Sequence, residues 1–143
     1  MDSDECADRF ADFFPDAGAV AVFSPAPKNA AALSEADLKK KEGEAILNIL
    51  NKEDWLVTLD ERGKQLSSEG LADFIQKRSN ESVKSIVFLI GGAFGLDEAV
   101  LQRANFKWSL SQLVFPHQLV RLILAEQVYR ACTILKNEKY HHK

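Results

Sequence analysis

The sequence predicts an α/β protein whose mostly parallel sheet is covered by helices on both faces. Two observations favour this fold. Short runs rich in β-branched and aromatic residues alternate with segments of helical periodicity along the 143 residues. The run at 86–90 is apolar at every position, as in strands that are buried on both faces of a sheet. The length fits one domain, and the chain has no repeats or low-complexity segments.

The first half of the chain is expected to hold two helices and two strands. In order, these are a short helix over 3–14, a strand over 19–23, a helix from 34 to about 50 and a strand over 55–59. Ser34 is a good N-cap because Asp37 follows three residues later, close to a capping box. The strand at 55–59 is expected to end at a polar turn, Asp60-Glu61-Arg62-Gly63.

The second half continues the alternation and brings strand ends together. It predicts a helix from Ser67 or Ser68, a strand over 86–90, a helix from 97 to about 104, a less regular stretch over 108–115, and a long helix from Pro116 to about Leu135. Ligands of parallel sheets lie outside the carboxyl ends of the strands. The loops after residues 59 and 90, together with the loop at 109–116, therefore predict a pocket at one edge of the sheet.

Composition limits the classes of function. The net charge of −3 does not indicate bulk binding to nucleic acid, although the last eight residues are basic. Any RNA contact would use local basic patches, supplied by more than one subunit. No apolar run reaches the ~18 residues of a membrane span, and the acidic N-terminus is unlike a secretory signal. Cys6 and Cys132 indicate reduced thiols of a cytosolic protein, and the three histidines predict no metal site.

Several stretches carry candidate chemistry, each with a structural alternative. Gly91-Gly92 would let the backbone lie against a ligand, or would simply form a tight turn. Asp60-Glu61-Arg62-Gly63 would supply acids, but solvated turns of this composition are common. Arg121 suits contact with RNA phosphate, whereas Arg130 lies four residues after Glu126 and fits an ion pair within a helix.

The C-terminal residues Tyr140, His141 and His142 also allow two interpretations. A disordered end is the usual one. Alternatively, an aromatic ring beside imidazoles suits stacking on an unpaired base together with phosphate contact.

Five stretches occur in the order and spacing of one known family. They are LIGGAFGL at 89–96, WSLS at 108–111, FPHQLVR at 115–121, EQVYRA at 126–131 and YHH at 140–142. Over roughly residues 22–143 the chain resembles the ribosomal RNA large subunit methyltransferase H family of the SPOUT class.

The resemblance implies a C-terminal trefoil knot, a homodimer and a cytoplasmic enzyme. It also implies S-adenosylmethionine as the methyl donor and N3 of a pseudouridine in large-subunit (23S) ribosomal RNA, within the ribosome, as the acceptor. The residues that match the cofactor site of the family are Leu59, Gly92, Ser111, Gln112, Leu113, Val114, Phe115 and Pro116.

The family also implies roles for the C-terminal residues. Tyr140, His141 and His142, with Arg121, are expected to contact RNA, and the tail is expected to approach the target nucleotide across the dimer. Tyr140 and His141 are the candidate catalytic residues, with His141 the candidate for handling the proton of N3.

Two departures from the family pattern matter. We expect one methyltransferase domain over 1–143 that lacks the usual N-terminal strand, because the chain opens with Met1-Asp2-Ser3-Asp4 rather than an apolar run. Val114 stands where threonine is common, which removes a hydroxyl group. The alternatives are an enzyme of this class with another RNA substrate and a catalytically inactive homodimer that binds RNA or cofactor.

Overall fold

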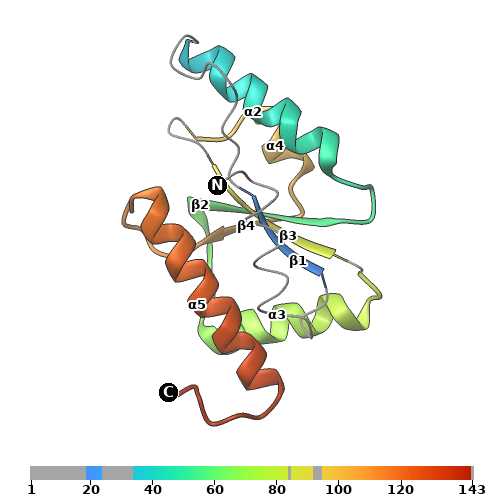
Figure 1. The fold of residues 1–143 in the computed structure, drawn as a ribbon, viewed down its shortest axis with the longest axis vertical. Helices are drawn as coiled ribbons and strands as arrows, with labels where there is room; N and C mark the ends of the chain where they lie inside the picture. Colours follow the sequence, from blue (N-terminus) through green and yellow to red (C-terminus); the bar gives the residue numbers. More distant parts are fainter. Residues whose placement is uncertain (1–18, 24–33, 84, 92–94, 143) are drawn as a thin grey trace.

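A parallel sheet forms the centre of the protein (Figure 1). The computed structural model describes residues 19–23, 34–83, 85–91 and 95–142. Within them, four strands pair in the order β1-β3-β2-β4, and every pair is parallel. The strands are β1 (Ala19–Phe23), β2 (Trp55–Gln65), β3 (Ser85–Ile90) and β4 (Phe106–Ser109). The predicted parallel sheet is confirmed, whereas the helix expected over 3–14 and the missing N-terminal strand fall outside the described residues.

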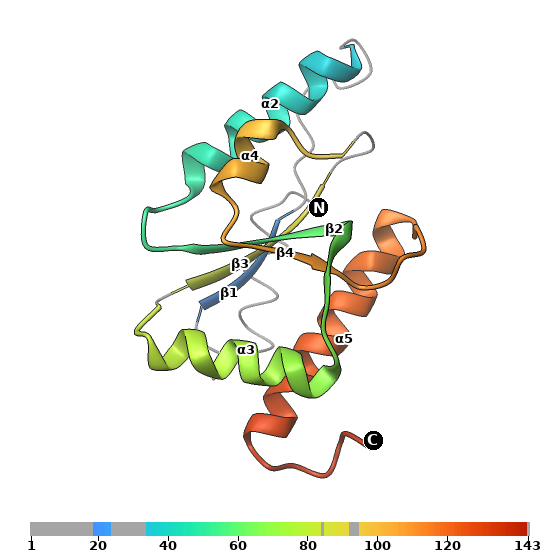
Figure 2. The same ribbon diagram turned by 180° about the vertical axis from the view of Figure 1, so that it is seen from behind.

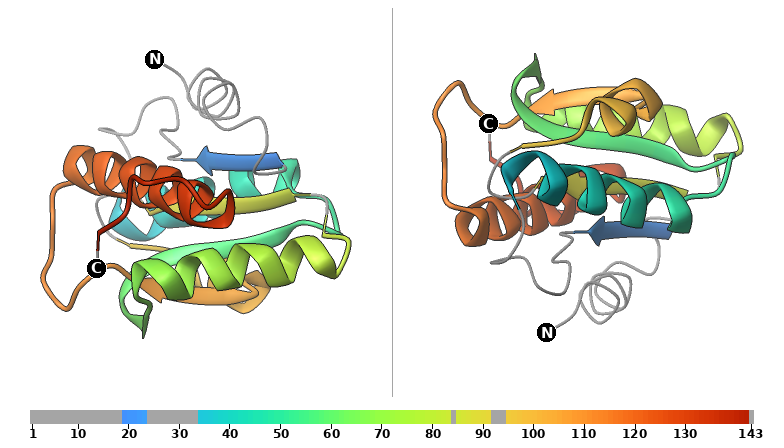
Figure 3. Two further views of the ribbon diagram at one scale, coloured as in Figure 1. Left: turned by 90° about the horizontal axis from the view of Figure 1, so that it is seen from below. Right: turned by 90° about the horizontal axis from the view of Figure 1, so that it is seen from above.

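Helices cover both faces of this sheet, as predicted. They are α2 (Glu35–Ile49), α3 (Ser68–Asn80), α4 (Glu98–Arg103) and α5 (His117–Leu135). Figure 2 shows α2 and α4 on one side of the sheet and α3 and α5 on the other. Helices α3 and α5 contact each other on their shared face, and Figure 3 views this face from below. None of these four helices has the length and apolar character needed to cross a membrane.

The apolar run of β3 is explained by its two buried faces. Ile86, Phe88 and Ile90 belong to the core beneath α3 and α5. Val87 and Leu89, which alternate with them, belong to the core beneath α2 and α4. All five side chains are buried. Because β3 lies between two strands and between two helix layers, none of these five positions tolerates a polar side chain without a buried partner.

Serine side chains fix the start of two helices. The Asp37 amide donates to Ser34 Oγ at 3.2 Å, which confirms the predicted N-cap of α2. The Gly70 amide donates to Ser67 Oγ at 2.9 Å, so Ser67 rather than Ser68 caps α3. Pro116 occupies the N-cap position of α5, one residue earlier than the first-turn place predicted for it.

Strand β2 is longer than predicted and contains an irregular segment. Leu59 and Lys64 both pair with Trp108 of β4, so residues 60–63 form an insertion in the ladder. The composition of this segment predicts a turn that ends the strand, but pairing resumes after it and continues to Gln65. Strand β4 likewise begins at Phe106, before the stretch at 108–115 in which a strand was expected.

Gly63 allows β2 to approach β4 closely, and its replacement by alanine is expected to destabilise the fold. A Cβ atom there would lie 2.6 Å from the carbonyl oxygen of Lys107 and 2.9 Å from the amide nitrogen of Trp108. Both neighbours are backbone atoms, so the strands would have to separate. We expect Gly63→Ala to lower the free energy of unfolding by about 1–3 kcal/mol, measured by urea denaturation.

The neighbouring exposed residue provides the control. Lys64→Ala should change the free energy of unfolding by less than about 0.5 kcal/mol. Equal stability of the Gly63→Ala and Lys64→Ala proteins would show that β2 and β4 are not in close contact at the insertion.

Candidate active site

A pocket of about 520 Å³ opens at the carboxyl ends of the strands. Its described walls come from the end of β2 with the inserted segment, from the end of β3, and from the loop between β4 and α5. The first residues of α5, His117 and Val120, complete the wall. The loops that the sequence places at one edge of the sheet therefore do enclose a common space, as expected for a parallel sheet.

Most of the expected cofactor residues surround this pocket. Those that line it are Leu59, Ser111, Leu113, Val114 and Phe115. Gln112 and Pro116 belong to the same loop and are exposed, but they are not among the residues that line the pocket. Gly92 lies outside the described residues.

The loop between β4 and α5 is held by its own serines and presents apolar side chains. Ser109 is buried and its hydroxyl donates to the Ser111 carbonyl at 2.7 Å. The Leu113 amide donates to Ser111 Oγ at 3.1 Å. Leu113 and Val114 are 68% and 80% exposed, which is unusual for such side chains. The loop thus places aliphatic groups at a pocket edge where they are available to contact a ligand or another chain.

The described glycines at the end of β3 have local reasons to be glycine. A Cβ atom on Gly91 would lie 3.1 Å from the Leu96 side chain, so the space beside this residue is filled by the protein itself. Gly95 has a φ of +89°, a conformation that other residues rarely adopt. Both glycines line the pocket.

One wall of the pocket is acidic. Glu35, Asp60 and Glu61 contribute carboxylates, and Arg62 contributes a guanidinium group. The Arg62 backbone amide and its Nη2 donate to Asp60 at 2.9 and 3.0 Å. The hydrogen bond from the Arg62 side chain lowers the pKa of Asp60, although burial acts in the opposite direction. The interpretation of this segment as a solvated turn is therefore wrong for Asp60, whose side chain is only 12% exposed.

A tight reversal at the end of α5 directs the C-terminal residues back along the helix. The Asn137 amide donates to the Ile134 carbonyl and the Glu138 amide to the Thr133 carbonyl, at 3.0 and 2.9 Å. Asn137 has a φ of +58°, so the two bonds form a Schellman motif with asparagine in the left-handed position. The chain beyond α5 is thereby fixed by backbone hydrogen bonds.

Tyr140 packs against α5 through three contacts. Its ring meets the Tyr129 ring edge-on at a centroid distance of 4.8 Å. The Arg130 guanidinium lies 4.9 Å from the Tyr140 ring centroid, and the hydroxyl donates to Glu126 Oε1 at 3.2 Å. Arg130 also pairs with Glu126, as the sequence spacing indicates. The interpretation as a disordered end is not supported for Tyr140.

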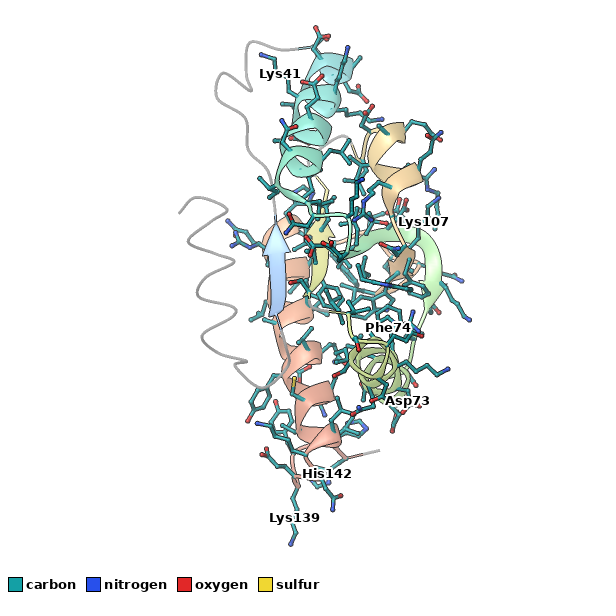
Figure 4. The ribbon with its side chains drawn as sticks, turned by 90° about the vertical axis from the view of Figure 1, so that its right-hand side faces the viewer. Lys41, Asp73, Phe74, Lys107, Lys139 and His142 are labelled. Atoms are coloured by element: carbon teal, nitrogen blue, oxygen red, sulfur yellow. The ribbon has the colours of Figure 1, made fainter. Side chains whose placement is uncertain are left out.

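The pocket lies at the N-terminal end of α5, whereas the C-terminal residues pack on the half of this helix from Glu126 onward. His117 lines the pocket, and the helix continues for 19 residues, or roughly 28 Å, before the reversal. Arg121, which is half-buried, is one turn from the pocket end. Figure 4 shows Lys139 and His142 at the far end of the molecule from Lys41 of α2. Among the described residues, Tyr140, His141 and His142 do not line the pocket of their own chain.

Several site features had no clear signal in the sequence. Glu35, Leu96 and His117 line the pocket, but each belongs to a helix or loop whose orientation depends on the packing of the sheet. Glu69 contacts His141 across 72 positions of sequence, a distance over which periodicity carries no information. Within the described residues, no group of three metal-ligating side chains is present.

Comparison with known proteins identifies the family. The profile of the family described as "Predicted SPOUT methyltransferase" matches residues 3–141. A protein of Christiangramia forsetii named "Ribosomal RNA large subunit methyltransferase H" is 51% identical over 83% of this chain and 76% of its own length. Proteins of the same name from Flavobacterium johnsoniae and Parabacteroides distasonis are 50% and 49% identical over the same shares. The chain therefore belongs to the ribosomal RNA large subunit methyltransferase H family of SPOUT methyltransferases.

Proposed function

We propose that the protein transfers a methyl group from S-adenosylmethionine to N3 of a pseudouridine in large-subunit (23S) ribosomal RNA. The single observation that carries this proposal is the pocket, whose walls contain most of the stretches that match the family. The names of the similar proteins support the RNA substrate. Action on ribosomal RNA in turn supports a cytoplasmic location.

The described residues of the pocket fit the proposed methyl donor. A volume of about 520 Å³ is in the range of small-molecule sites. Leu59, Leu113 and Phe115 offer apolar surface for an adenine ring, while Asp60 and Glu61 place carboxylates where a cationic ligand gains from them. When bound, the donor supplies a methyl group activated by a positively charged sulfur. The protein would hold it mainly through backbone and apolar contacts.

We also propose that residues 1–143 form one domain with the C-terminal trefoil knot that the family implies. The support is the path of the chain after β4. This strand lies at the edge of the sheet, yet the next helix, α5, returns to contact the central strand β3 and helix α3.

The active form is proposed to be a homodimer that buries one side of α5. Leu119, Leu122 and Tyr129 recur at helical spacing and are 41%, 66% and 43% exposed. Such a stripe, together with the exposed Leu113 and Val114 of the loop before α5, is typical of an interface. A second copy is the occupant that also brings a tail to the pocket, because the tail of one chain packs on the half of α5 from Glu126 onward and does not line that chain's own pocket.

Within this dimer, the tail of one chain is proposed to present the target base to the pocket of the other. Tyr140 has a ring that can stack on an unpaired base, and His142 is exposed beside it. Arg121, at the pocket end of α5, is placed to contact a phosphate of the same RNA segment. Alignment of N3 with the methyl carbon supplies much of the acceleration.

Transfer to N3 also requires that this nitrogen lose its proton. The acceptor is either a side chain of the tail or water. Tyr140 is the candidate for holding the base in line, whereas both ring nitrogens of His141 are already engaged by Glu69 and Arg130. Both stand beside the charged groups Arg130 and Glu126, which orient them.

The proposal is tested in two steps. Calorimetry should show that the unmodified protein binds S-adenosylmethionine. The protein should then transfer labelled methyl groups to ribosomes from a strain that lacks the modification. Mass spectrometry of the RNA should identify the product as N3-methylpseudouridine. Transfer to free RNA but not to ribosomes would indicate a different substrate. Binding without any transfer would identify a catalytically inactive homodimer and contradict the proposed activity.

A further inference from the structure

His141 is held on both of its ring nitrogens. Its Nε2 lies 2.9 Å from Glu69 Oε1, and its Nδ1 lies 3.1 Å from Arg130 Nη1. Arg130 is itself anchored because its Nε donates to Glu126 Oε1 at 3.0 Å. The His141 side chain is 17% exposed, while the Glu69 side chain is 40% exposed.

The two partners determine which nitrogen carries the proton. A guanidinium group has only donors, so Nδ1 must accept from Arg130. A carboxylate has only acceptors, so Nε2 must carry the proton that Glu69 receives. When both hydrogen bonds are formed, the proton of the ring therefore lies on Nε2. Protonation of Nδ1 would place two N–H groups against each other and lose the Arg130 contact.

We propose that Glu69 is a positioning residue for methyl transfer, which acts by holding His141, and through it the tail, in the orientation that presents the target base. This inference rests on the proposed function of the tail. Glu69 lies in the first turn of α3, beyond the Ser67 cap, and α3 packs along α5. Glu69 therefore links the tail to α3, whereas the tail itself follows α5.

A second set of hydrogen bonds makes this anchor rigid. Ser68, the neighbour of Glu69, donates its hydroxyl to Gln127 Oε1 at 2.8 Å. Gln127 in turn donates to Glu126 Oε2 at 2.8 Å. Glu126 also accepts a hydrogen bond from the Tyr140 hydroxyl and forms a salt bridge with Arg130. The first turn of α3, the segment 126–130 of α5 and the tail thus form one connected polar network.

This arrangement assigns His141 a structural part in the reaction. Both of its nitrogens are occupied, so it accepts no proton while the network is intact. As the new N3–carbon bond forms and the sulfur–carbon bond breaks, with its electron pair left on sulfur, the N3 proton passes to water. What Glu69 and Arg130 supply is the fixed position of the tail.

Variants at both ends of the contact test the inference. Glu69→Leu removes the acceptor and should lower kcat on ribosomes on the order of 10–100-fold, without a change in S-adenosylmethionine affinity, because Glu69 does not line the pocket. Glu69→Gln keeps an acceptor oxygen and should retain kcat within about threefold. His141→Gln keeps one donor and one acceptor but no base, and should retain far more activity than His141→Ala. Asp73→Asn, an exposed change on the same helix, is the control (Figure 4).

A spectroscopic measurement tests the contact independently of activity. Nitrogen–proton correlation spectra should show His141 of the unmodified protein and of Glu69→Gln as the neutral form protonated at Nε2, and Glu69→Leu should lose this preference. Protonation at Nδ1 in the unmodified protein would overturn the inference, as would wild-type kcat for Glu69→Leu or a His141→Gln protein as inactive as His141→Ala. Absence of transfer by the unmodified protein would contradict the proposed function, while the spectra would still decide whether Glu69 holds His141.

Discussion

Replacing Leu122 by glutamate is expected to separate the dimer and to abolish methyl transfer. The side chain is 66% exposed on α5, so the folded chain should tolerate the change within about 0.5 kcal/mol. In the proposed dimer, however, the carboxylate would be buried without a partner, at a cost of about 3–5 kcal/mol. Association should weaken by at least about 100-fold, measured by sedimentation, and transfer to ribosomes should fall with the dimer population.

A second exposed aliphatic residue provides a matched control. Ile49 is 53% exposed on α2, which covers the opposite face of the sheet. Ile49→Glu introduces the same charge in a similar environment and should leave both dimerisation and transfer unchanged. A Leu122→Glu protein that remains a dimer at low concentration would show that the α5 stripe is not the interface.

Replacing Leu59 by tryptophan is expected to abolish cofactor binding. Leu59 pairs with Ile90 and Trp108 just before the insertion in β2 and lines the pocket, so the larger indole would occupy space proposed for the ligand. We expect the affinity for S-adenosylmethionine to fall by at least about 100-fold, or about 2.7 kcal/mol, measured by calorimetry. The free energy of unfolding should fall by only about 1–3 kcal/mol, which a folded protein survives.

A variant of nearly equal volume separates the loss of space from any other effect. Leu59→Met keeps the volume and the apolar character and should bind S-adenosylmethionine within about threefold of the unmodified protein, at a cost below about 1.5 kcal/mol in stability. Binding of S-adenosylmethionine to a folded Leu59→Trp protein with unchanged affinity would place the cofactor outside this pocket.

The fold was predictable where local chemistry decides it. The apolar run of β3 predicts a strand buried on both faces, and Ser34 predicts the start of α2 from a single hydrogen bond. The insertion in β2 was not predictable, because residues 60–63 have the composition of a turn. Only the approach of β4, which Gly63 permits, shows that the strand continues.

The site shows the same division. Strand ends and glycines predict a pocket at the rim of a parallel sheet, since every strand ends at that edge. The motif match, rather than periodicity, selects Ser111 and Phe115 as lining residues. The contact between Glu69 and His141 joins distant parts of the chain, and it depends on how α3 packs on α5. Packing of this kind emerges only when the whole core is assembled.

The most direct test of a site shared between two chains is the activity of mixed dimers. Leu59→Trp removes the pocket but leaves the tail, and Tyr140→Ala combined with His141→Ala removes the tail but leaves the pocket. Each protein alone should be inactive on ribosomes. After mixing and exchange of subunits, half of the dimers contain one intact pocket facing one intact tail, so about a quarter of the wild-type activity should return. A mixture that exchanges subunits and remains inactive would contradict the composite site.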